Sequence, residues 1–452
     1  MAWKLVYLAP SMPKPADTAI EPSSVLPRPR ALKIGLQRYR GRKPAGETTA
    51  CLENLSPRPS LTDELAWGEI ENAAGRLATA ARSTDTIDQL ETRLGDPSGN
   101  WPVGARIAAR LARSRLALAR QPQPARLSVV IPVYGERQRL LSPAEDPLGE
   151  EWLERKFHQL EWLTRGLAGV SWEMTVVDDG CPEGSGRLIE ERLGRRHPGT
   201  PARVLFLEEA LCGSHPALAG LRSVGESRKG GAVQLGLWEA AARAKPGSVI
   251  LFTDADLSTH LGQAGLLLEG LCRPGIAIAA GSRRGAGSIA VKEASRDARG
   301  RLLIYLWKLL APRLAYLEDT QCGFKALRPE TIRQLLPRVR EYGFAFDFAL
   351  LASCEKTWPR SVQPVPISWI DSPEASTTTD RDPYLGMLQS FERLSRSRLG
   401  RSAEAEVLAG VIRSLDEASW AQAVETVAPR SPARIDSELP RIAARELALL
   451  SA

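Results

Sequence analysis

Leu251-Phe252-Thr253-Asp254-Ala255-Asp256 is the stretch that decides the fold of this 452-residue chain. It closes an apolar run that begins at Ser248, and a run of this type and length predicts a strand buried on both faces. Asp254 and Asp256 then lie at the carboxyl end of that strand, where open α/β sheets place their ligands. Residues i and i+2 of an extended segment point the same way, so the two carboxylates repel each other unless a cation lies between them. Mg²⁺ or Mn²⁺ prefers such oxygen ligands, usually with help from a substrate phosphate. A polar loop after a strand is the alternative interpretation.

The same change from apolar to polar residues recurs along the chain, and strands alternate with helices. Further strands are expected at 127–132, 172–177, 203–207 and 276–280. Helices are expected at 149–168, 186–193 and 232–244. Strict alternation of this kind predicts a parallel, doubly wound sheet.

Other predicted strand ends carry chemistry of their own. Asp178 and Asp179 can accept hydrogen bonds from a nucleobase imide or a ribose hydroxyl. Lys229-Gly230-Gly231 places a cation and bare backbone amides at a helix N-terminus, which suits a phosphate. Taken singly, an Asp pair is often a helix cap and Lys-Gly-Gly is often a turn. Several such strand ends in one sheet are hard to explain by chance, and they indicate one shared site.

Composition excludes several classes of protein. The chain is 43% hydrophobic and 25% charged, as in a soluble globular protein, and no run reaches the roughly 18–20 apolar residues of a membrane span. No secretory signal is expected. Six cysteines without Cys-x-x-Cys spacing argue against a zinc site or disulfide scaffold and favour a reducing, cytoplasmic compartment.

The positive charge of the chain is concentrated near its start. Net charge is +7, and residues 1–60 hold ten Lys or Arg against four Asp or Glu. A basic arm can contact anionic lipid or nucleic acid, but a solvated tail is the commoner role, and no nucleic acid partner is expected.

Four segments are expected in the chain. Residues 1–60 form a basic, Pro/Arg-rich, irregular segment, and 61–125 form a helical extension with helices over 61–95 and 103–120, then a linker. Residues 126–395 hold the alternating strands and helices, and 396–452 form a helical tail. Tail helices are expected at 385–394, 403–415 and 441–450.

Five motifs occur in an order that matches a known family. They are Ile131-Pro132-Val133-Tyr134-Gly135-Glu136, Val176-Val177-Asp178-Asp179-Gly180, Lys229-Gly230-Gly231-Ala232, Thr253-Asp254-Ala255-Asp256 and Asp319-Thr320-Gln321-Cys322-Gly323-Phe324-Lys325. Together they resemble a family-two glycosyltransferase, and the last motif is most similar to the dolichyl-phosphate glucose synthase branch and its polyprenyl-phosphate relatives. The resemblance spans about 126–395. It implies a GT-A type α/β fold, doubly wound with a mostly parallel sheet, with helical N- and C-terminal extensions.

The resemblance also implies roles for individual residues. A nucleotide-sugar pocket would be lined by Pro132, Tyr134, Glu136, Asp179, Lys229 and Gly230. Asp254 would approach the ribose or donor sugar, and Asp256 would be the main ligand of Mg²⁺ or Mn²⁺. Arg283 and Arg284 would face a phosphate, and Gln321 and Lys325 belong to the acceptor-side motif.

The implied reaction breaks a sugar–diphosphate bond, so basic residues and a cation would stabilise the leaving nucleotide. A phosphate acceptor is already anionic and needs no strong base. A hydroxyl acceptor needs one, and Asp319 is then the candidate, with a helix cap as the alternative role.

The function expected from these features is a metal-dependent, inverting hexosyltransferase with a nucleotide-diphospho-sugar donor, UDP-glucose first. The acceptor is a polyprenyl phosphate or a soluble molecule. A non-catalytic scaffold built on a degenerate transferase domain is the alternative. A nucleotidyltransferase is disfavoured, because the first strand lacks the glycine-rich basic signature that such an enzyme would carry there.

Several features depart from the family. The stretch 302–310 is apolar with a basic rim, and it fits either a core helix or a peripheral helix on the inner face of a membrane. Residues 208–228 form a lid, an acceptor loop or, more simply, a surface insertion. Ser376-Thr377-Thr378-Thr379 stands where a basic residue would help to hold the diphosphate. His260 either reaches the site or, as we favour, lies at the surface.

Overall fold

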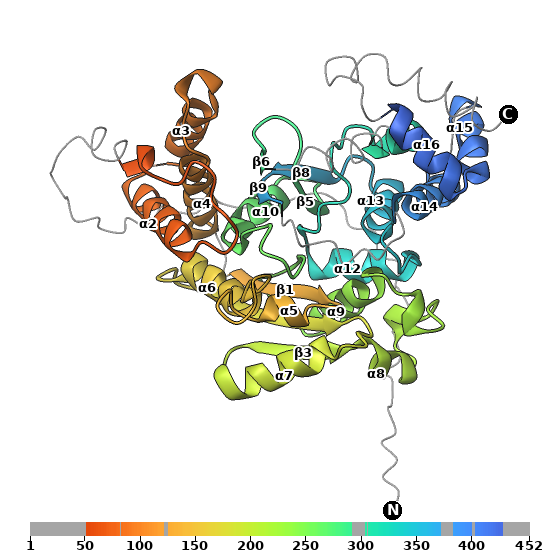
Figure 1. The fold of residues 1–452 in the computed structure, drawn as a ribbon, viewed down its shortest axis with the longest axis horizontal. Helices are drawn as coiled ribbons and strands as arrows, with labels where there is room; N and C mark the ends of the chain where they lie inside the picture. The colour runs from red at the N-terminus through yellow and green to blue at the C-terminus, as the bar shows by residue number, and fades with distance from the viewer. Residues whose placement is uncertain are drawn as a thin grey trace, which may run out of the picture. The chain divides into compact units, whose positions relative to one another are not determined.

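A seven-stranded sheet forms the centre of the protein, in the order β3-β2-β1-β4-β7-β5-β8 (Figure 1). The computed structural model describes residues 51–81, 83–121, 125–291, 303–304, 306–371, 383–399 and 403–427. The strands of this sheet are β1 (Ala125–Val133), β2 (Val170–Asp178), β3 (Ala202–Phe206), β4 (Ser248–Phe252), β5 (Ile278–Ser282), β7 (Lys325–Leu327) and β8 (Val362–Pro366). A separate parallel pair joins β6 (Ile289–Val291) to β9 (Ser368–Ile370). The GT-A type, mostly parallel α/β fold predicted from the sequence is confirmed.

Register brings the predicted strand ends to one edge. β1 pairs with β2 over its whole length, so that Val133 lies opposite Asp178. The amide of Asp179 donates to the carbonyl of Val133 at 3.0 Å, and the amide of Thr253 donates to the carbonyl of Val130 at 3.0 Å. The carboxyl ends of β1, β2 and β4 therefore open together, as expected of parallel strands.

Strand β7 runs antiparallel to both of its neighbours. It pairs Lys325 with Phe252 of β4 and with Ala280 of β5. Because β7 begins at Lys325, residues 319–324 run into the sheet at the same edge where β4 and β5 leave it. This reversal places the seven-residue motif 319–325 beside the acidic pair that follows β4.

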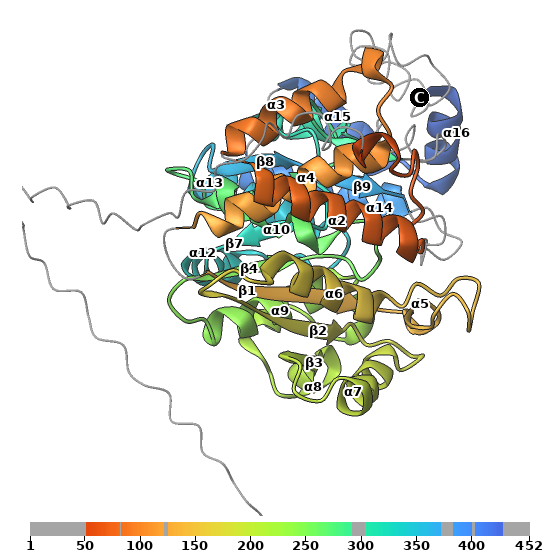
Figure 2. The ribbon, with the colours of Figure 1, turned by 90° about the vertical axis from the view of Figure 1, so that its left-hand side faces the viewer.

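Helices cover both faces of the sheet, which explains its continuous apolar strands. The core on one face contains buried residues of α9 (Gly230–Ala242), α12 (Pro329–Leu335), α13 (Phe346–Thr357), α14 (Pro383–Arg398), α15 (Ala403–Ser414) and α16 (Glu417–Val427). The core on the other face contains buried residues of α2 (Glu64–Ala80), α3 (Thr84–Gly95), α4 (Val103–Ala119), α5 (Arg137–Leu140), α6 (Trp152–Thr164), α7 (Ser185–Arg196) and α10 (Ala264–Leu271). Figures 1 and 2 show α2, α3 and α4 on the opposite side of the molecule from α14, α15 and α16.

The predicted extension at 61–95 is helical, but it is two helices rather than one. Ser83 begins α3 by accepting a hydrogen bond from the amide of Thr86, which separates α3 from α2. The extension shares the core of the sheet, since Ile70 of α2 and Ile107 of α4 are fully buried. The domain limits drawn from the sequence stay a prediction.

The tail contains a helix that the sequence analysis missed. The helices expected at 385–394 and 403–415 are confirmed as α14 and α15, and α16 follows them. Trp420 of α16 is buried against the same core. The helix expected at 441–450, the segment 1–50 and the Ser-Thr stretch at 376–379 lie outside the described residues.

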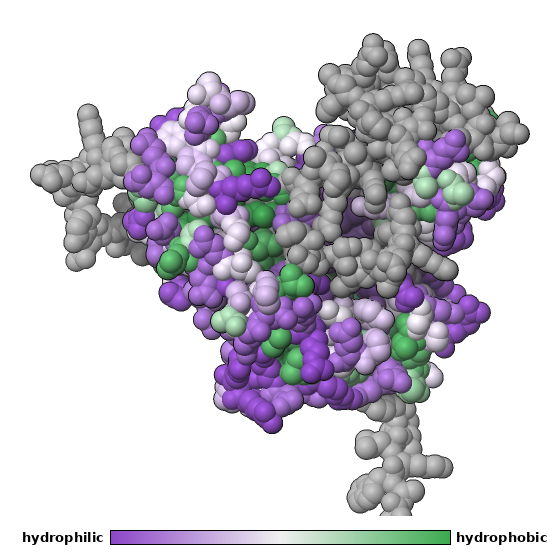
Figure 3. Space-filling view, in the orientation of Figure 1, coloured by the Kyte–Doolittle hydropathy of each residue, from purple (hydrophilic) through white to green (hydrophobic). Residues whose placement is uncertain are grey.

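The described part of 302–310 supports the core interpretation. Residues 303–304 and 306–310 are helical, and Leu306, Trp307 and Leu310 have no exposed surface. Among the residues that the structure covers, no helix is long and apolar enough to cross a bilayer. The face of the molecule over α7 consists mainly of hydrophilic residues (Figure 3).

Replacing Trp307 tests this core packing. Trp307→Ala should lower the free energy of unfolding by about 3–5 kcal/mol, the usual cost of emptying a large aromatic site. The indole N–H has no hydrogen-bond partner, so the loss is one of packing. Urea unfolding measures it, with Val407→Ala as control, because Val407 is 70% exposed and its loss should cost under about 0.5 kcal/mol. Equal effects of the two variants would contradict burial of Trp307.

Candidate active site

The acidic pair after β4 faces a lysine from another element. Lys229 Nζ lies 2.6 Å from Asp254 Oδ1, and both side chains remain partly exposed. Partial burial alone would raise the pKa of Asp254, but the ammonium of Lys229 outweighs this effect and lowers it. Burial and the neighbouring charge of Asp254 raise the pKa of Asp256. In the part of the chain that the structure describes, Asp254 forms an ion pair with Lys229, whereas Asp256 forms none and has only the more distant charges of Lys156 and Arg139 in its favour.

Lys229 is held by an unusual backbone conformation at the start of α9. Its φ is +76°, and its amide donates to Asp179 Oδ2 at 2.7 Å. Gly230 follows in close contact with Tyr342, since an added Cβ would lie 2.6 Å from the Tyr342 carbonyl carbon. The amides of Arg228 and Gly231 both donate to the Tyr342 carbonyl oxygen, at 2.9 and 3.3 Å. The Lys-Gly-Gly motif is therefore packed against the loop before α13.

The two carboxylates after β2 have different surroundings. Asp178 accepts three hydrogen bonds from the amides of Gly180, Cys181 and Gly186, at 2.9, 2.9 and 2.7 Å, which occupies both of its oxygens. This arrangement favours a structural role for Asp178 over the predicted contact with a nucleotide.

Asp179 is a better candidate for a ligand contact. Its Oδ1 accepts from the Ser227 hydroxyl at 2.5 Å, and burial raises its pKa to about 6. Ser227 ends the 208–228 segment, in which Leu218 and Leu221 are buried. The interpretation of this segment as a plain surface insertion is wrong, because it packs in the core and supports Asp179.

The turn after β1 contributes one buried carboxylate. Burial raises the pKa of Glu136 to about 8, although Arg139 Nη2 lies 2.7 Å from Glu136 Oε1. The second oxygen, Oε2, is buried and has no hydrogen-bond partner. Pro132 is buried within β1, whereas Tyr134 is 46% exposed at the rim. Of the three residues predicted here, Tyr134 and Glu136 offer atoms to a ligand.

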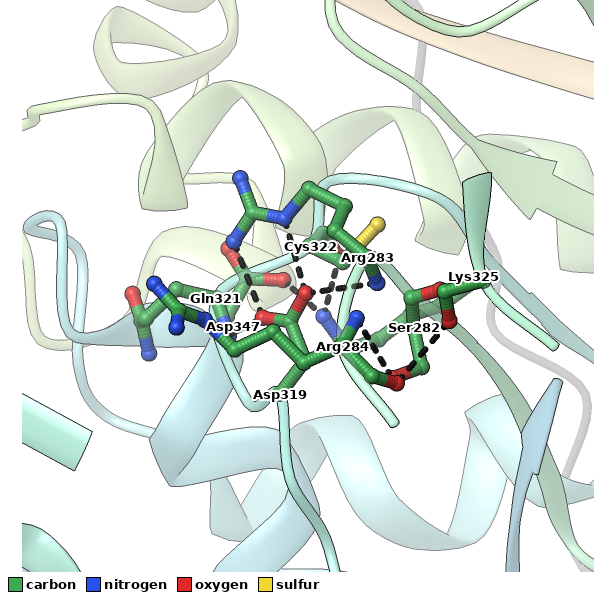
Figure 4. Close-up of polar contacts among 9 residues, drawn as sticks. Ser282, Arg283, Arg284, Asp319, Gln321, Cys322, Lys325 and Asp347 are labelled. Atoms are coloured by element: carbon green, nitrogen blue, oxygen red, sulfur yellow. Dashed lines mark hydrogen bonds and ion pairs between the residues drawn. The ribbon is translucent and has the colours of Figure 1, made fainter. Parts of the chain in front are cut away.

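Arg283, which follows β5, forms a fork with Asp319 (Figure 4). Its Nε and Nη2 donate to Oδ2 and Oδ1 at 2.7 and 2.9 Å, and its amide also donates to Oδ2 at 3.0 Å. Burial would raise the pKa of Asp319, but Arg283 outweighs it and holds the pKa well below its usual range. Asp319 is thus a weak proton acceptor.

Lys325 lies deeper than the sequence suggested. Its side chain is fully buried, forms an ion pair with Asp347 and donates to the Cys322 carbonyl at 2.5 Å. We expected Lys325, with Asp319 and Arg283, among the catalytic residues, and its burial favours a positioning role instead. Lys229 Nζ lies 3.7 Å from Asp347 Oδ2, so one carboxylate joins the two lysines.

A glycine of the 319–325 motif makes room for the acidic pair. An added Cβ at Gly323 would lie 2.3 Å from Asp254 Oδ2. The motif is therefore tied to Asp254 by shape as well as by charge.

Sequence reasoning missed Lys156 on α6. Its side chain has no exposed surface and donates to the Thr259 carbonyl at 3.2 Å. Burial lowers its pKa to about 8, against the opposing charges of Asp256 and Asp254. The signal was available, because Lys156 occupies the apolar stripe of α6 between the buried Leu153 and Leu160.

His260 was expected at the surface, and this expectation is wrong. Only 3% of His260 is exposed, and its Nε2 lies 3.0 Å from Glu71 Oε1 of α2. The His-containing segment after the acidic pair is thus covered by the N-terminal extension.

The acidic pair suits a divalent cation that a phosphate completes. Among the described residues, no group of three His, Cys, Asp or Glu side chains could hold a metal by itself. Mg²⁺ typically takes one or two carboxylates and adds substrate phosphates, which matches Asp254 and Asp256. Burial and, after it, the charge of Asp254 raise the pKa of Asp256, and a cation bound beside the pair would oppose both effects.

Comparisons with known proteins find glucosyltransferases among the similar sequences. No family model matches the sequence. Dolichyl-phosphate β-glucosyltransferase of Drosophila melanogaster is 30% identical over 238 residues, which cover 51% of this chain and 62% of that protein. The chain is therefore similar to this glucosyltransferase over about half of its own length. The Dictyostelium discoideum glucosyltransferase is 24% identical over 277 residues, covering 60% of this chain and 73% of that protein. The match covers about three fifths of the length of the Drosophila glycosyltransferase and 61% of the length of the human one.

A solved structure is similar over a larger share of the chain. Glucosyl-3-phosphoglycerate synthase from Mycobacterium tuberculosis, in complex with Mg²⁺ and UDP, has a TM-score of 0.43 and 19% identity. The match covers 65% of this chain and 84% of that glycosyltransferase.

Asp179 should make stability depend on pH. Its pKa in the folded protein, about 6, lies above the ordinary value of 3.8, so folding favours its protonated form. Stability from this group is present at low pH and is lost as the pH rises from about 4 to about 6. Urea unfolding across this range should show wild type losing up to about 3 kcal/mol relative to Asp179→Asn. A constant difference between the two proteins would contradict a buried, protonated Asp179.

Proposed function

We propose that the protein is a metal-dependent, inverting glycosyltransferase that moves a hexose from a nucleotide-diphospho-sugar to a phosphate acceptor. UDP-glucose is the donor we expect first, and the acceptor is a polyprenyl phosphate or a soluble phosphate. The observation that carries this proposal is the ion pair of Lys229 with Asp254, the first carboxylate of the acidic pair after β4. Relation to glucosyltransferases supports it.

The chain's own residues suggest how the donor is held. Asp179 and the neighbouring amides face the base side, and Lys229 at the N-terminus of α9 supplies positive charge for a diphosphate. Asp254 and Asp256 would hold Mg²⁺ or Mn²⁺, which supplies charge neutralisation to the leaving diphosphate. Gly323 leaves the space in which Asp254 can turn toward the ligand.

The pairing of the acidic groups favours an acceptor that is already anionic. Asp319 is held by Arg283, and Asp347 lies between Lys325 and Lys229. A carboxylate whose pKa is lowered by a bound arginine takes a proton poorly, so Asp319 is not suited to be the base for a hydroxyl. A phosphate needs no such base at neutral pH, and Arg283 and Arg284 lie on the side where it would approach. If that phosphate is carried by a polyprenol, the protein would transfer the hexose at the cytoplasmic face of a membrane.

Donor cleavage tests the proposal through the acidic pair. Purified protein should release one nucleotide from a panel of nucleotide sugars with Mn²⁺ or Mg²⁺, and Asp256→Asn should lower that rate at least about 100-fold, since it removes a ligand of the cation that would stabilise the leaving nucleotide. Nucleotide release is followed by chromatography. The control is Asp85→Asn, an exposed carboxylate on α3 that should leave the rate unchanged. Binding of a nucleotide without turnover would favour the scaffold function. If no nucleotide binds, both the transferase and a nucleotide-binding scaffold are contradicted.

Acceptor chemistry has its own test. A short polyprenyl phosphate or a soluble sugar phosphate should accept the hexose, while the matching alcohol should react at least about 100 times more slowly, the usual scale of general base catalysis. Product formation from a labelled donor measures both rates side by side. Equal rates for the alcohol and the phosphate would show that the site contains an effective base.

A further inference from the structure

We propose that the N-terminal helices α2 and α4 are positioning elements of the active site: Glu71 of α2 fixes the segment after Asp256, and Arg110 of α4 fixes the turn after Arg283. Both helices lie outside the region 126–395 that resembles the transferases. The structural part of this inference is independent of the proposed function, and its effect on catalysis rests on that function.

Glu71 is a buried carboxylate shared by two imidazoles. It is 5% exposed, and its Oε1 and Oε2 lie 3.0 Å from His260 Nε2 and 2.7 Å from His158 Nε2. His260 Nδ1 accepts from the Gly262 amide at 3.0 Å, so the proton of this ring sits on Nε2 and is donated to Glu71. One acidic residue of α2 therefore sets both the orientation and the tautomer of His260.

Aromatic rings fix the same imidazole from two directions. Trp67 of α2 stacks on His260, with ring centroids 5.2 Å apart, and Trp162 of α6 meets it edge-on at 6.2 Å. The Trp162 indole donates to the Glu71 carbonyl at 3.3 Å. Since His260 is four residues from Asp256, a shift of α2 would be passed to the acidic pair through a short, buried segment.

Buried contacts also hold the residues between Asp256 and His260. The amide of Leu257 donates to Glu150 Oε2 at 3.3 Å, and the Ser258 carbonyl accepts from the Ile370 amide at 3.1 Å. Together with the Lys156 bond to Thr259, these contacts leave the segment few alternative conformations. The end of the segment at His260 is the part that depends on α2.

Arg110 of α4 makes the corresponding contact near Arg283. Its Nη1 and Nη2 donate to the carbonyls of Pro366 and Gly287 at 2.6 and 2.7 Å, and its Nε donates to Glu91 Oε1 at 2.6 Å. The guanidinium thereby ties the turn between β5 and β6 to the end of β8. Its side chain is 7% exposed, so water cannot readily replace these bonds.

The turn held by Arg110 starts at Arg283 itself. Ser288 closes it, because its hydroxyl donates to the carbonyls of Ser282 and Arg284, both at 2.9 Å. Gly287 has a φ of +85°, so this turn depends on a left-handed residue at the point where Arg110 binds. Loss of Arg110 would free the side of the turn that faces α4 and would let the Arg283 fork with Asp319 move.

The two contacts therefore predict different defects. Glu71 acts on the side of the acidic pair, so its loss should weaken binding of the nucleotide with its cation. Arg110 acts on the Arg283 side, so its loss should slow transfer to the acceptor while nucleotide affinity is kept. A general loss of stability would instead change both quantities together.

The experiment compares four variants of the full chain. Glu71→Gln is matched with Glu69→Gln, an exposed residue on the same helix. Arg110→Lys is matched with Arg106→Lys. Arg106 lies one turn earlier on α4, and it lines a cavity of about 520 Å³ together with Arg110. Hydrogen exchange is measured on peptides covering 257–262 and 284–289, together with UDP affinity in Mn²⁺ and the steady-state constants for transfer.

Glu71→Gln should speed exchange in 257–262 and weaken UDP binding in Mn²⁺ by about tenfold or more, as loss of a residue supporting metal ligands does. Arg110→Lys should speed exchange in 284–289 and lower kcat about tenfold or more, with UDP affinity unchanged, because small misplacements of a charged group cost rate. The two control variants should match wild type in every readout.

Uniform exchange changes, equal losses in both parameters, or the same defects in the controls would overturn the inference. If Glu71→Gln or Arg110→Lys does not fold, Trp67→Leu and Glu91→Gln loosen the same contacts more gently and carry the same expectations. If wild type binds no nucleotide, the proposed function fails while the exchange pattern still decides whether α2 and α4 position these segments.

Discussion

The ammonium of Lys229 is the charge on which the site depends. It lies between Asp254 after β4 and Asp347 at the start of α13, and Asp347 in turn pairs with the buried Lys325. Breaking the buried Lys325–Asp347 pair by removing one partner should cost about 3–5 kcal/mol, because the remaining charge is left buried without its partner. The lysines that alternate with these carboxylates hold them close together at the sheet edge. Without the lysines, the carboxylates would repel one another. Among the described residues this arrangement leaves Asp256 without an ion pair, and we propose that a divalent ion bound with a nucleotide diphosphate supplies the missing positive charge.

Shape supports this arrangement of charges. The antiparallel β7 returns the 319–325 motif to the edge where β4 ends, and Gly323 lets the chain pass directly beside Asp254. On the same edge Arg283 and Asp319 form a closed fork, which suits orientation of an anionic group better than removal of a proton. Helices from before residue 120 then cover the segments that follow these charges. The transferase-like region and its N-terminal extension thus share one core.

The sequence was sufficient for the strands and for the edge at which the motifs meet, because apolar runs and register are local patterns. It also singled out Lys229, Asp254 and Asp179 from their neighbours in the chain, and the structure brings these three residues together. It could not show that Lys325 is buried, since that depends on pairing with Asp347 through the reversed strand β7. His260 was misplaced for a similar reason: its partner, Glu71, is 189 residues away in a helix with no motif. Interactions between distant elements set which charges are paired, and one sequence does not contain that information.

Binding of UDP measured by calorimetry, with and without Mn²⁺, tests the central claim most directly. The account predicts that Mn²⁺ strengthens UDP binding strongly in wild type, because Asp254 and Asp256 share the ion with the diphosphate. It also predicts that Lys229→Met weakens UDP binding both with and without Mn²⁺, because Lys229 supplies charge that does not come from the metal. UDP binding that is indifferent to Mn²⁺ and to Lys229 would contradict the assignment of this sheet edge as the diphosphate site.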